Sequence, residues 1–399
     1  MRLYCRRCAV HYDGPGERRC MECETVLETE FDGVLRLGRI LNNRTLFGKY
    51  PDRLPSDGSL AGVEGGTPLI EADRLASSVG TDATIYLKDE RRNPTGSFKD
   101  RAFAPMLSAA AESGEDRILT ASTGNAATAC AHYAARGNLT CLLLVDGDTP
   151  DEKLLEPSLY GAEIVRVDGL FDASATAFES FLESVADRLE AYLAVAHQPL
   201  SPLSMEGVKT ISFEVAEQLE WTAPDVVVTP VGGGDNIVAQ YKGYRELRSA
   251  NLLDRLPRMV GVQASGAAPL VESIERGTDE PVEVEPETIA SGIDAAFSGR
   301  HALETVRESG GTAVAVSDEE ILAGERELAQ RTGVWAEPAA ASVVPALERL
   351  VSDGVVGDDD TVVLTVTGSG HKHVGPVEDA VDDVDTVAFD ATAVTESLY

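Results

Sequence analysis

Residues 117–146 read RILTASTGNAATACAHYAARGNLTCLLLVD. A short apolar run is followed by Ser-Thr-Gly-Asn, an alanine-rich segment and a second apolar run. Strand, helix and strand in this order form the unit from which parallel sheets are built. We expect the helix to be stopped by Gly137 and the two strands to pair side by side.

The same alternation continues along the chain. Further Val/Leu-rich strands are expected at 84–90, 162–168, 225–230, 258–264 and 361–368. A helix follows the strand that ends near residue 230, with apolar residues at helical spacing at Ile237, Val238, Tyr241 and Tyr244. The pattern predicts an α/β fold with helices on both faces of a parallel sheet, and ligands at the carboxyl ends of the strands.

Composition limits the class of protein. The chain has 399 residues, 43% of them hydrophobic, which is enough for two or three packed domains. No apolar run reaches the roughly 18 residues that span a membrane. The N-terminus shows no apolar signal core, so we expect a cytoplasmic protein.

The formal net charge is −33. Such a chain repels polyanions, so we expect no nucleic acid partner. Acidic residues spread along the whole sequence indicate adaptation to a salt-rich cytoplasm, where screening at about 1 M salt acts over roughly 3 Å.

Four cysteines lie close to the N-terminus in the spacing C-x2-C-x11-C-x2-C. Four thiolates at these spacings suit a structural zinc ion, and the metal supplies the folding energy that so short a segment lacks. Two disulfides or a redox pair are the alternatives. Cys130 and Cys141 lie in apolar segments and are expected in the core. The predicted metal ligands are Cys5, Cys8, Cys20 and Cys23.

Three segments carry groups suited to an aldehyde cofactor with a phosphate. NPTGSFKDR, at 93–101, holds Lys99, whose amine can form a Schiff base, although a surface lysine is the alternative. PVGGGDNI, at 230–237, places three glycines before a helix, where free N–H groups bind phosphate; a plain tight turn is the alternative. TVTGSGHKH, at 365–373, offers the hydroxyl of Thr367 to a ring nitrogen.

A fourth segment, ASTGNAATA at 121–129, supplies donors for a carboxylate or a ring hydroxyl. A Schiff-base lysine, a phosphate-binding loop, an anion loop and a hydroxyl for a ring nitrogen together describe a pyridoxal phosphate site.

The motifs GSFKDR, ASTGN, EGVKTISFEVAEQL, PVGGG, EPAAAS and TGSG occur in this order between about residues 65 and 372. In this the chain resembles the threonine synthase family, of the tryptophan-synthase-β group of pyridoxal phosphate enzymes (fold type II). Some members also carry an N-terminal zinc ribbon. The resemblance implies two three-layer αβα domains: a large one from 31–98 and 200–380 and a small one from 99–199. A zinc ribbon (1–30) precedes them and an acidic tail (381–399) follows.

The resemblance also implies residue roles. Lys99 is the catalytic lysine, which holds the cofactor and moves protons. The implied cofactor-binding residues are Phe98, Lys99, Asn125, Gly232, Gly233, Gly234, Asn236 and Thr367. The implied substrate-binding residues are Ser122, Thr123 and Gly124.

The implied reaction converts O-phospho-L-homoserine and water into L-threonine and phosphate. A paralogue with another amino acid substrate stays open, either a serine/threonine dehydratase or a β-replacement enzyme such as cysteate synthase. A catalytically inactive protein of the same fold also stays open as an alternative. Relatives of this fold type are often dimers, so a homodimer is kept open, although no self-associating motif is present.

Two departures from the family pattern concern phosphate binding. The family places an Asn-Ser pair and an arginine just before EGQKT, whereas residues 196–209 read AHQPLSPLSMEGVK. Asp235 stands where glycine is usual, and a carboxylate facing a phosphate is repelled. We therefore expect Asp235 to turn away and bond to backbone or to an arginine.

The charge leads to a first prediction. In dilute buffer the self-repulsion of the acidic surface is no longer screened, so the fold should loosen. Circular dichroism before and after dialysis from multimolar KCl into dilute buffer measures this. An unchanged spectrum would contradict the adaptation to salt.

Overall fold

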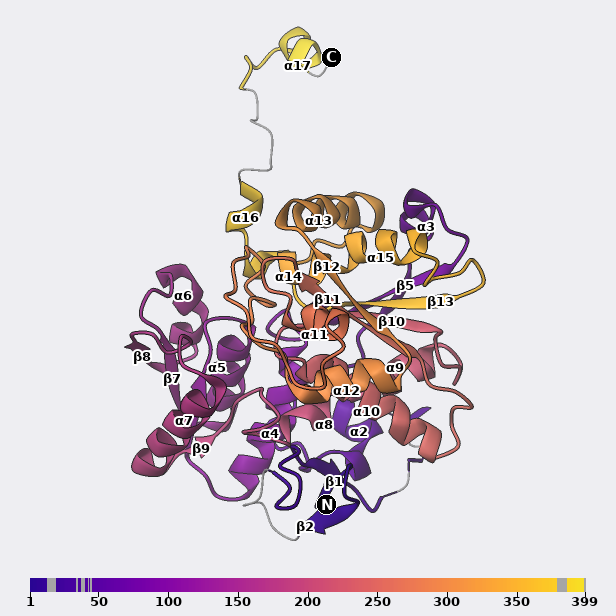
Figure 1. The fold of residues 1–399 in the computed structure, drawn as a ribbon. Helices are drawn as coiled ribbons and strands as arrows, with labels where there is room; N and C mark the ends of the chain where they lie inside the picture. Colours follow the sequence, from indigo (N-terminus) through magenta and orange to yellow (C-terminus); the bar gives the residue numbers. More distant parts are fainter. Residues whose placement is uncertain are drawn as a thin grey trace.

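The computed structural model describes residues 1–12, 19–33, 35–36, 40–41, 43, 45–378 and 386–397. They form a three-stranded, a six-stranded and a four-stranded sheet (Figure 1). Parts of the predicted ribbon (13–18) and of the predicted tail (381–385 and 398–399) lie outside the described residues. None of the helices described here is both long and apolar enough to cross a bilayer.

The six-stranded sheet has the order β12-β11-β10-β13-β5-β4. Its neighbours pair in parallel except at one edge, where β4 runs antiparallel to β5. In chain order the strands are β4 (Leu69–Glu71), β5 (Thr84–Asp89), β10 (Val226–Pro230), β11 (Arg258–Ala264), β12 (Thr312–Val316) and β13 (Thr361–Val366). We call this sheet and the helices on it the large-sheet unit.

Both faces of the six-stranded sheet are buried. On β10, Val226 and Val228 pack into one apolar cluster and Val227 into another, because successive side chains of a strand point to opposite faces. One face is covered by α3 (Asp73–Val79), α13 (Asp318–Thr332), α14 (Pro338–Ala341) and α15 (Val343–Ser352). The other is covered by α8 (Ser204–Val208), α9 (Thr210–Gln218), α10 (Asp235–Ser249), α11 (Pro269–Glu275) and α12 (Arg300–Glu308). This is the three-layer arrangement expected from the sequence.

The four-stranded sheet, order β8-β7-β6-β9, is parallel throughout. Its strands are β6 (Arg117–Ala121), β7 (Thr140–Asp146), β8 (Glu163–Val167) and β9 (Tyr192–Leu193). Its helices are α4 (Lys99–Glu112), α5 (Asn125–Gly137), α6 (Asp151–Leu159) and α7 (Ala175–Leu189). We call this the small-sheet unit.

The end of α5 differs from the expectation. Gly137 is still helical, and Asn138 takes the left-handed cap with φ 53°. Asparagine tolerates this conformation. Gly137 is instead a close-packing position, since a Cβ there would lie 3.0 Å from atoms of both Leu60 and Leu139.

The N-terminal strands β1 (Arg2–Cys5), β2 (Val10–Tyr12) and β3 (Glu28–Glu30) form an antiparallel sheet in the order β2-β1-β3. We call described residues 1–12 and 19–33 the ribbon. It lies beneath α8 and α10 in Figure 1. A short helix, α2 (Leu46–Lys49), follows it, and α16 (Gly375–Glu378) and α17 (Ala391–Ser397) lie at the other end of the chain. No residue of α17 is buried.

The α/β fold and the seven predicted strands of the two parallel sheets are confirmed. The sequence did not indicate β4, β9 or β12, which have three, two and five residues. Cys130 and Cys141 are buried, as expected. The predicted domain boundaries stay a prediction.

A buried network of charges joins the start of α4 to the large-sheet unit. Arg101 has 0% exposure and bonds to Glu90, which follows β5, at 2.6 and 2.8 Å. It also bonds to Glu214 on α9 at 2.7 and 2.9 Å. Lys88 on β5 donates to Glu214 at 2.8 Å. Every charge in the network has a partner, as burial requires.

Glu214 is the member of this network to test. Burial raises the pKa of its carboxyl, but Arg101 and Lys88 outweigh burial, so the net shift is downward. Its contribution to stability is therefore complete above about pH 4.3 and is lost as the pH falls. Glu214→Gln should lower the free energy of unfolding at pH 7 by about 3–5 kcal/mol.

Denaturant unfolding in high salt measures this loss. Glu327→Gln, at a surface pair with Arg331, is the control and should change stability little. An equal, small effect of both substitutions would contradict the role of the network.

Candidate active site

Lys99 is the first residue of α4, at the junction of the two parallel sheets. The Phe98 N–H donates to the carbonyl oxygen of Thr367, just after β13, at 2.9 Å. Ser97 and Gly368 form an antiparallel bridge beside it. The predicted lysine and the predicted ring-nitrogen hydroxyl residue are thus brought together from positions far apart in the chain.

The environment of Lys99 lowers the pKa of its amine. Burial lowers its pKa, while the charges of Asp235 and Glu337 act in the opposite direction and only partly cancel this. The Lys99 ammonium lies 4.9 Å from the centroid of the Phe98 ring. A neutral amine is the form that attacks an aldehyde.

Glu337 links Asn125 to this site. The side-chain amide of Asn125, at the start of α5, lies 2.9 Å from each oxygen of the Glu337 carboxylate. The Glu337 N–H donates to the Gly368 carbonyl at 3.1 Å. Burial raises the pKa of Glu337, and the bond from Asn125 moderates the rise.

The other residues of the predicted anion loop precede Asn125. Ser122 and Thr123 are partly exposed and Gly124 is exposed. The Gly124 N–H donates to the Ser122 hydroxyl at 3.2 Å. Asn125 and its anion loop thus stand at the carboxyl end of β6, at the same junction as Lys99.

The three glycines lie between β10 and α10. Gly234 has φ 106°, and a Cβ there would lie 2.4 Å from the Cβ of Ala302, so only glycine fits. The Gly233 carbonyl accepts from the Gly299 N–H at 2.8 Å. The loop is thus held rigidly, and the first N–H groups of α10 open toward it, as an anion requires.

Asn236 contributes differently from its glycine neighbours. Its side-chain amide donates to the Thr229 hydroxyl at 3.2 Å, and its side-chain oxygen accepts from Gln240 at 3.1 Å. The side chain is therefore engaged in the core. What remains for a phosphate is the backbone N–H of Asn236.

Asp235 turns toward the segment at 197–198, as expected. It accepts from the Gln198 N–H at 2.9 Å and lies 3.7 Å from His197 and 3.5 Å from His301. Its partners besides backbone are thus histidines, not the arginine that was the other expectation. Burial raises its pKa, but the two histidines outweigh burial and bring the pKa well below its usual range.

These residues fit pyridoxal phosphate. The glycine loop would receive its phosphate, Lys99 its aldehyde, and Asn125 and Thr367 the polar atoms of its ring. Comparison with known proteins agrees with this fit. The family model "Pyridoxal-phosphate dependent enzyme" matches residues 60–368.

Two relatives match over nearly their whole length. The chain is 35% identical to the threonine synthase of Methanosarcina acetivorans over 406 residues, covering 100% of this chain and 98% of that protein. It is 41% identical to that of Mycobacterium tuberculosis, covering 88% and 94%. The chain belongs to the threonine synthase family of pyridoxal-phosphate dependent enzymes.

Solved structures support the fold. An L-serine ammonia-lyase from Rhizomucor miehei matches with TM-score 0.66 at 21% identity, covering 78% of this chain and 96% of that one. The serine racemase of maize matches with TM-score 0.64 at 21% identity, covering 84% of this chain and 91% of that one. Fold type II with its two parallel sheets is thereby shown.

The four predicted metal ligands converge in the ribbon. The sulfur atoms of Cys5, Cys8, Cys20 and Cys23 all lie within 4.8 Å of one another. All four are free thiols, which fits a tetrahedral zinc site. His11 stands apart and pairs with Glu30 at 2.7 Å.

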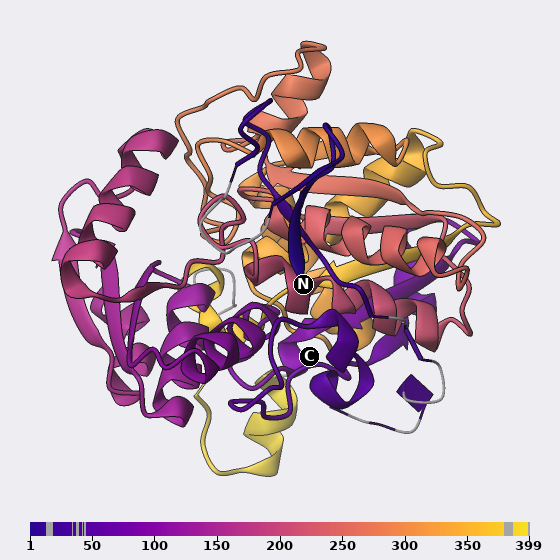
Figure 2. The ribbon, with the colours of Figure 1, turned by 90° about the horizontal axis from the view of Figure 1, so that it is seen from below.

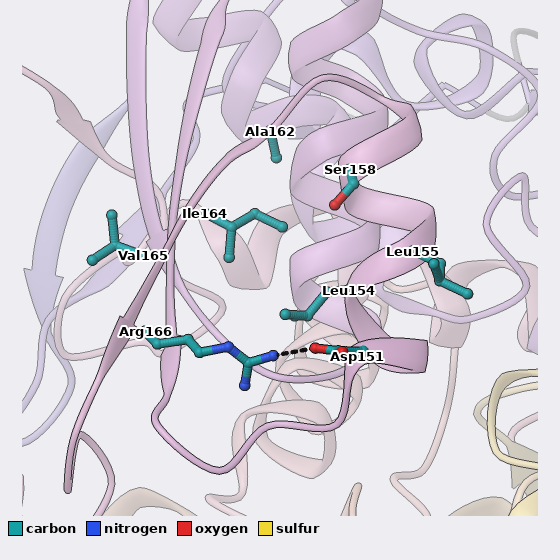
Figure 3. A pocket seen from close by; sticks show the side chains of 8 residues that line it. All are labelled: Asp151, Leu154, Leu155, Ser158, Ala162, Ile164, Val165 and Arg166. Carbon is teal, nitrogen blue, oxygen red and sulfur yellow. Dashed lines mark hydrogen bonds and ion pairs between the residues drawn. The ribbon is translucent and has the colours of Figure 1, made fainter.

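An open groove of about 840 Å³ lies elsewhere, between α6 and β8 (Figure 3). It contains none of the predicted site residues. Its apolar side chains are flanked by the ion pair of Arg166 and Asp151 at 2.6 Å. We assign it no part in the chemistry.

Sequence reasoning missed three groups near the site: Glu337, His197 and His301. Glu337 belongs to the EPAAAS motif, which was noted without a role. The two histidines become meaningful only through their common contact with Asp235.

Glu337 yields a prediction about Lys99. Its carboxylate stabilises the Lys99 ammonium, so Glu337→Gln should lower the pKa of Lys99, and pyridoxal phosphate should attach at lower pH. We expect the midpoint of attachment to fall by about one pH unit. The visible absorbance of the protein, titrated with cofactor across pH, measures it.

Glu325→Gln is the matched control. Glu325 accepts a hydrogen bond from Trp335 at 2.6 Å, and the charges that act on Lys99 are those of Asp235 and Glu337. Coinciding midpoints for wild type and Glu337→Gln would contradict the coupling of Glu337 to Lys99.

Proposed function

We propose that the protein is a threonine synthase, which converts O-phospho-L-homoserine and water into L-threonine and phosphate. The observation that supports this most strongly is Lys99 with a lowered pKa, held beside Thr367, Asn125 and the glycine loop. The relatives named threonine synthase, at 35–41% identity over most of the chain, support the same reaction.

In this proposal Lys99 is the catalytic base. Its amine would hold the aldehyde of the cofactor and would take up and return protons at the carbons of the substrate. Phe98 fixes the position of the lysine through its bond to Thr367 and forms part of the pocket wall. A lowered pKa increases the fraction of neutral Lys99 amine that is available to accept a proton.

The glycine loop would position the cofactor through its phosphate, and the anion loop would position the substrate through its carboxylate. The N–H groups of Gly232, Gly233, Gly234 and Asn236 would bind the cofactor phosphate. Ser122, Thr123 and Gly124 would bind the substrate's carboxylate. Asn125 would bond to the ring hydroxyl and Thr367 to the ring nitrogen. When bound, pyridoxal phosphate supplies an electron sink for the carbanion that proton removal creates.

The substrate's phosphate needs a cation, and the segment at 197–206 contains no arginine. Arg300 is paired with Glu280 at 3.1 Å, and Lys372 with Glu156. Lys153 on α6 is the better candidate. Its charge reaches the site, because it counteracts part of the rise that burial gives to the pKa of Glu337.

The absence of an arginine from the segment at 197–206 also keeps a second candidate function open. This function is that of a paralogue that acts on another amino acid by dehydration or β-replacement. Its support is the loss of the charge-assisted phosphate contacts, each worth about 1.5–3 kcal/mol. Product analysis separates the two.

Further properties complete the proposal. We place the protein in a salt-rich cytoplasm, with a structural zinc ion in the ribbon and a homodimer as its assembly. We also propose the division into residues 1–30, 31–98 with 200–380, 99–199 and 381–399. Size measurement in multimolar KCl and metal analysis test the assembly and the zinc.

The activity is tested by phosphate release from O-phospho-L-homoserine in multimolar KCl. Wild type should release phosphate and form threonine, and Lys99→Ala should lose activity by a factor of at least about 1,000. Phosphoserine and serine are offered in parallel. Turnover of serine or phosphoserine without turnover of O-phospho-L-homoserine would favour the paralogue, and no covalent cofactor in wild type would overturn both.

A further inference from the structure

The ribbon contacts the large-sheet unit through buried polar groups. Lys242 on α10 donates to the carbonyl oxygen of Thr29 at 2.7 Å and to its hydroxyl at 2.9 Å. Thr29 in turn bonds to Glu206 on α8. Arg245 on α10 pairs with Glu28 at 2.8 Å. The ribbon is therefore fixed to α10, the helix that follows the glycine loop and whose first turn would face the cofactor phosphate.

The ribbon also reaches the small-sheet unit. Arg19, the neighbour of Cys20, lies 3.3 Å from Glu179 on α7. Figure 2 shows the indigo N-terminal strands crossing the underside of the molecule. Arg19 is about half exposed, so this pair alone adds little stability. The pair matters because Glu179 also contacts His197.

A short segment joins the ribbon to the glycine loop from this side. Glu179 lies 3.4 Å from Nε2 of His197, whose Nδ1 lies 3.7 Å from Asp235. The Gln198 N–H donates to Asp235 at 2.9 Å, while its side-chain amide donates to the Leu27 carbonyl at 3.3 Å. His197 and Gln198 thus each contact Asp235 on one side, and the ribbon, directly or through Glu179, on the other.

The ribbon end of this segment depends on the metal site. Leu27 has 0% exposure and packs in the ribbon's apolar cluster with Cys5 and Cys20. So small a cluster cannot hold its shape by burial alone, which is why the four thiols need a metal. Without a metal, the Leu27 carbonyl would depend on the contacts of its neighbours Glu28 and Thr29 alone for the position in which Gln198 reaches it.

The other end of the segment sets the phosphate loop. Asp235 is the first residue of α10 and directly follows Gly234, so its position fixes the direction of the N–H groups that meet the phosphate. Burial lowers the pKa of His197, but Asp235 and Glu179 outweigh burial and raise it to about 9. His197, between Asp235 and Glu179, would offset the repulsion between Asp235 and a phosphate bound at the glycine loop.

We propose that metal binding in the ribbon and cofactor binding at the glycine loop are coupled, and that His197 and Gln198 are the positioning residues that couple them. This explains together two departures from the family pattern, Asp235 and the segment at 197–198, which meet in one contact. The inference rests on the cofactor site proposed above.

The test is a titration of cofactor-free protein with pyridoxal phosphate in multimolar KCl, followed by absorbance. It is done on Zn²⁺-loaded protein and on protein stripped with a chelator. Stripping should weaken cofactor binding at least about fivefold, the usual lower range of such coupling. By linkage, pyridoxal phosphate should tighten Zn²⁺ binding by the same factor, measured by competition with a chromophoric chelator.

Gln198→Ala and His197→Ala carry the specific prediction. In Zn²⁺-loaded protein each should weaken cofactor binding, and in the double variant stripping should have little additional effect. His11→Ala, on the ribbon but bonded to Glu30, is the control and should keep the full effect of stripping. Circular dichroism verifies that each variant is folded.

The outcomes are distinguishable. Equal cofactor affinity of loaded and stripped wild type overturns the coupling and leaves the proposed function intact. The same loss on stripping in wild type and double variant overturns the role of His197 and Gln198. A wild type that binds no pyridoxal phosphate in either state fails the proposed function itself.

Discussion

The pairing of Arg101 with Glu90 and Glu214 is the constraint on which the site depends. Arg101 stands two residues after Lys99, and a fully buried guanidinium has to satisfy its five N–H groups within the protein. The carboxylates that satisfy it come from the end of β5 and from α9. The first turn of α4 is therefore held to the large-sheet unit, although the rest of that helix packs beside α5. Lys99 is placed at the junction by this anchor and by the bond of Phe98 to Thr367.

This arrangement explains why a lysine followed by Asp-Arg marks the site. Asp100 accepts from both the backbone and the hydroxyl of Thr95 at 2.9 Å, which closes the preceding turn. The three successive charged residues thus have three separate tasks: Lys99 serves the site, Asp100 closes the loop, and Arg101 enters the core. The buried contacts of Asp100 and Arg101 therefore argue against a surface position for Lys99.

Much of the fold could be predicted because most of its strands are short Val/Leu-rich runs, and the central ones, β10, β11 and β13, are buried on both faces. The missed strands lack that signal: β12 is TAVAV and mostly half-buried, and β4 has only three residues on the sheet edge. The site was predictable where one residue type implies a chemistry, as with Lys99 and the glycines. Glu337 was not, because its contact with Asn125 joins residues 212 positions apart. In the sequence alone, His197 and Asp235 are separate departures from the family pattern, and only the structure shows that the two side chains lie together.

Charge balance inside the site decides whether so acidic a protein can hold phosphorylated molecules. His197 and His301 hold the pKa of Asp235 well below its usual range, and burial raises the pKa of Glu337 above its ordinary value. Glu337 is thus shifted toward the protonated form, and the charge of Lys153 on α6 also acts on it. Because high salt shortens the reach of the surface charges to a few ångströms, a phosphate in the site responds to these local groups and not to the net charge of −33. In high salt, an acidic surface and an anion-binding site are compatible for this reason.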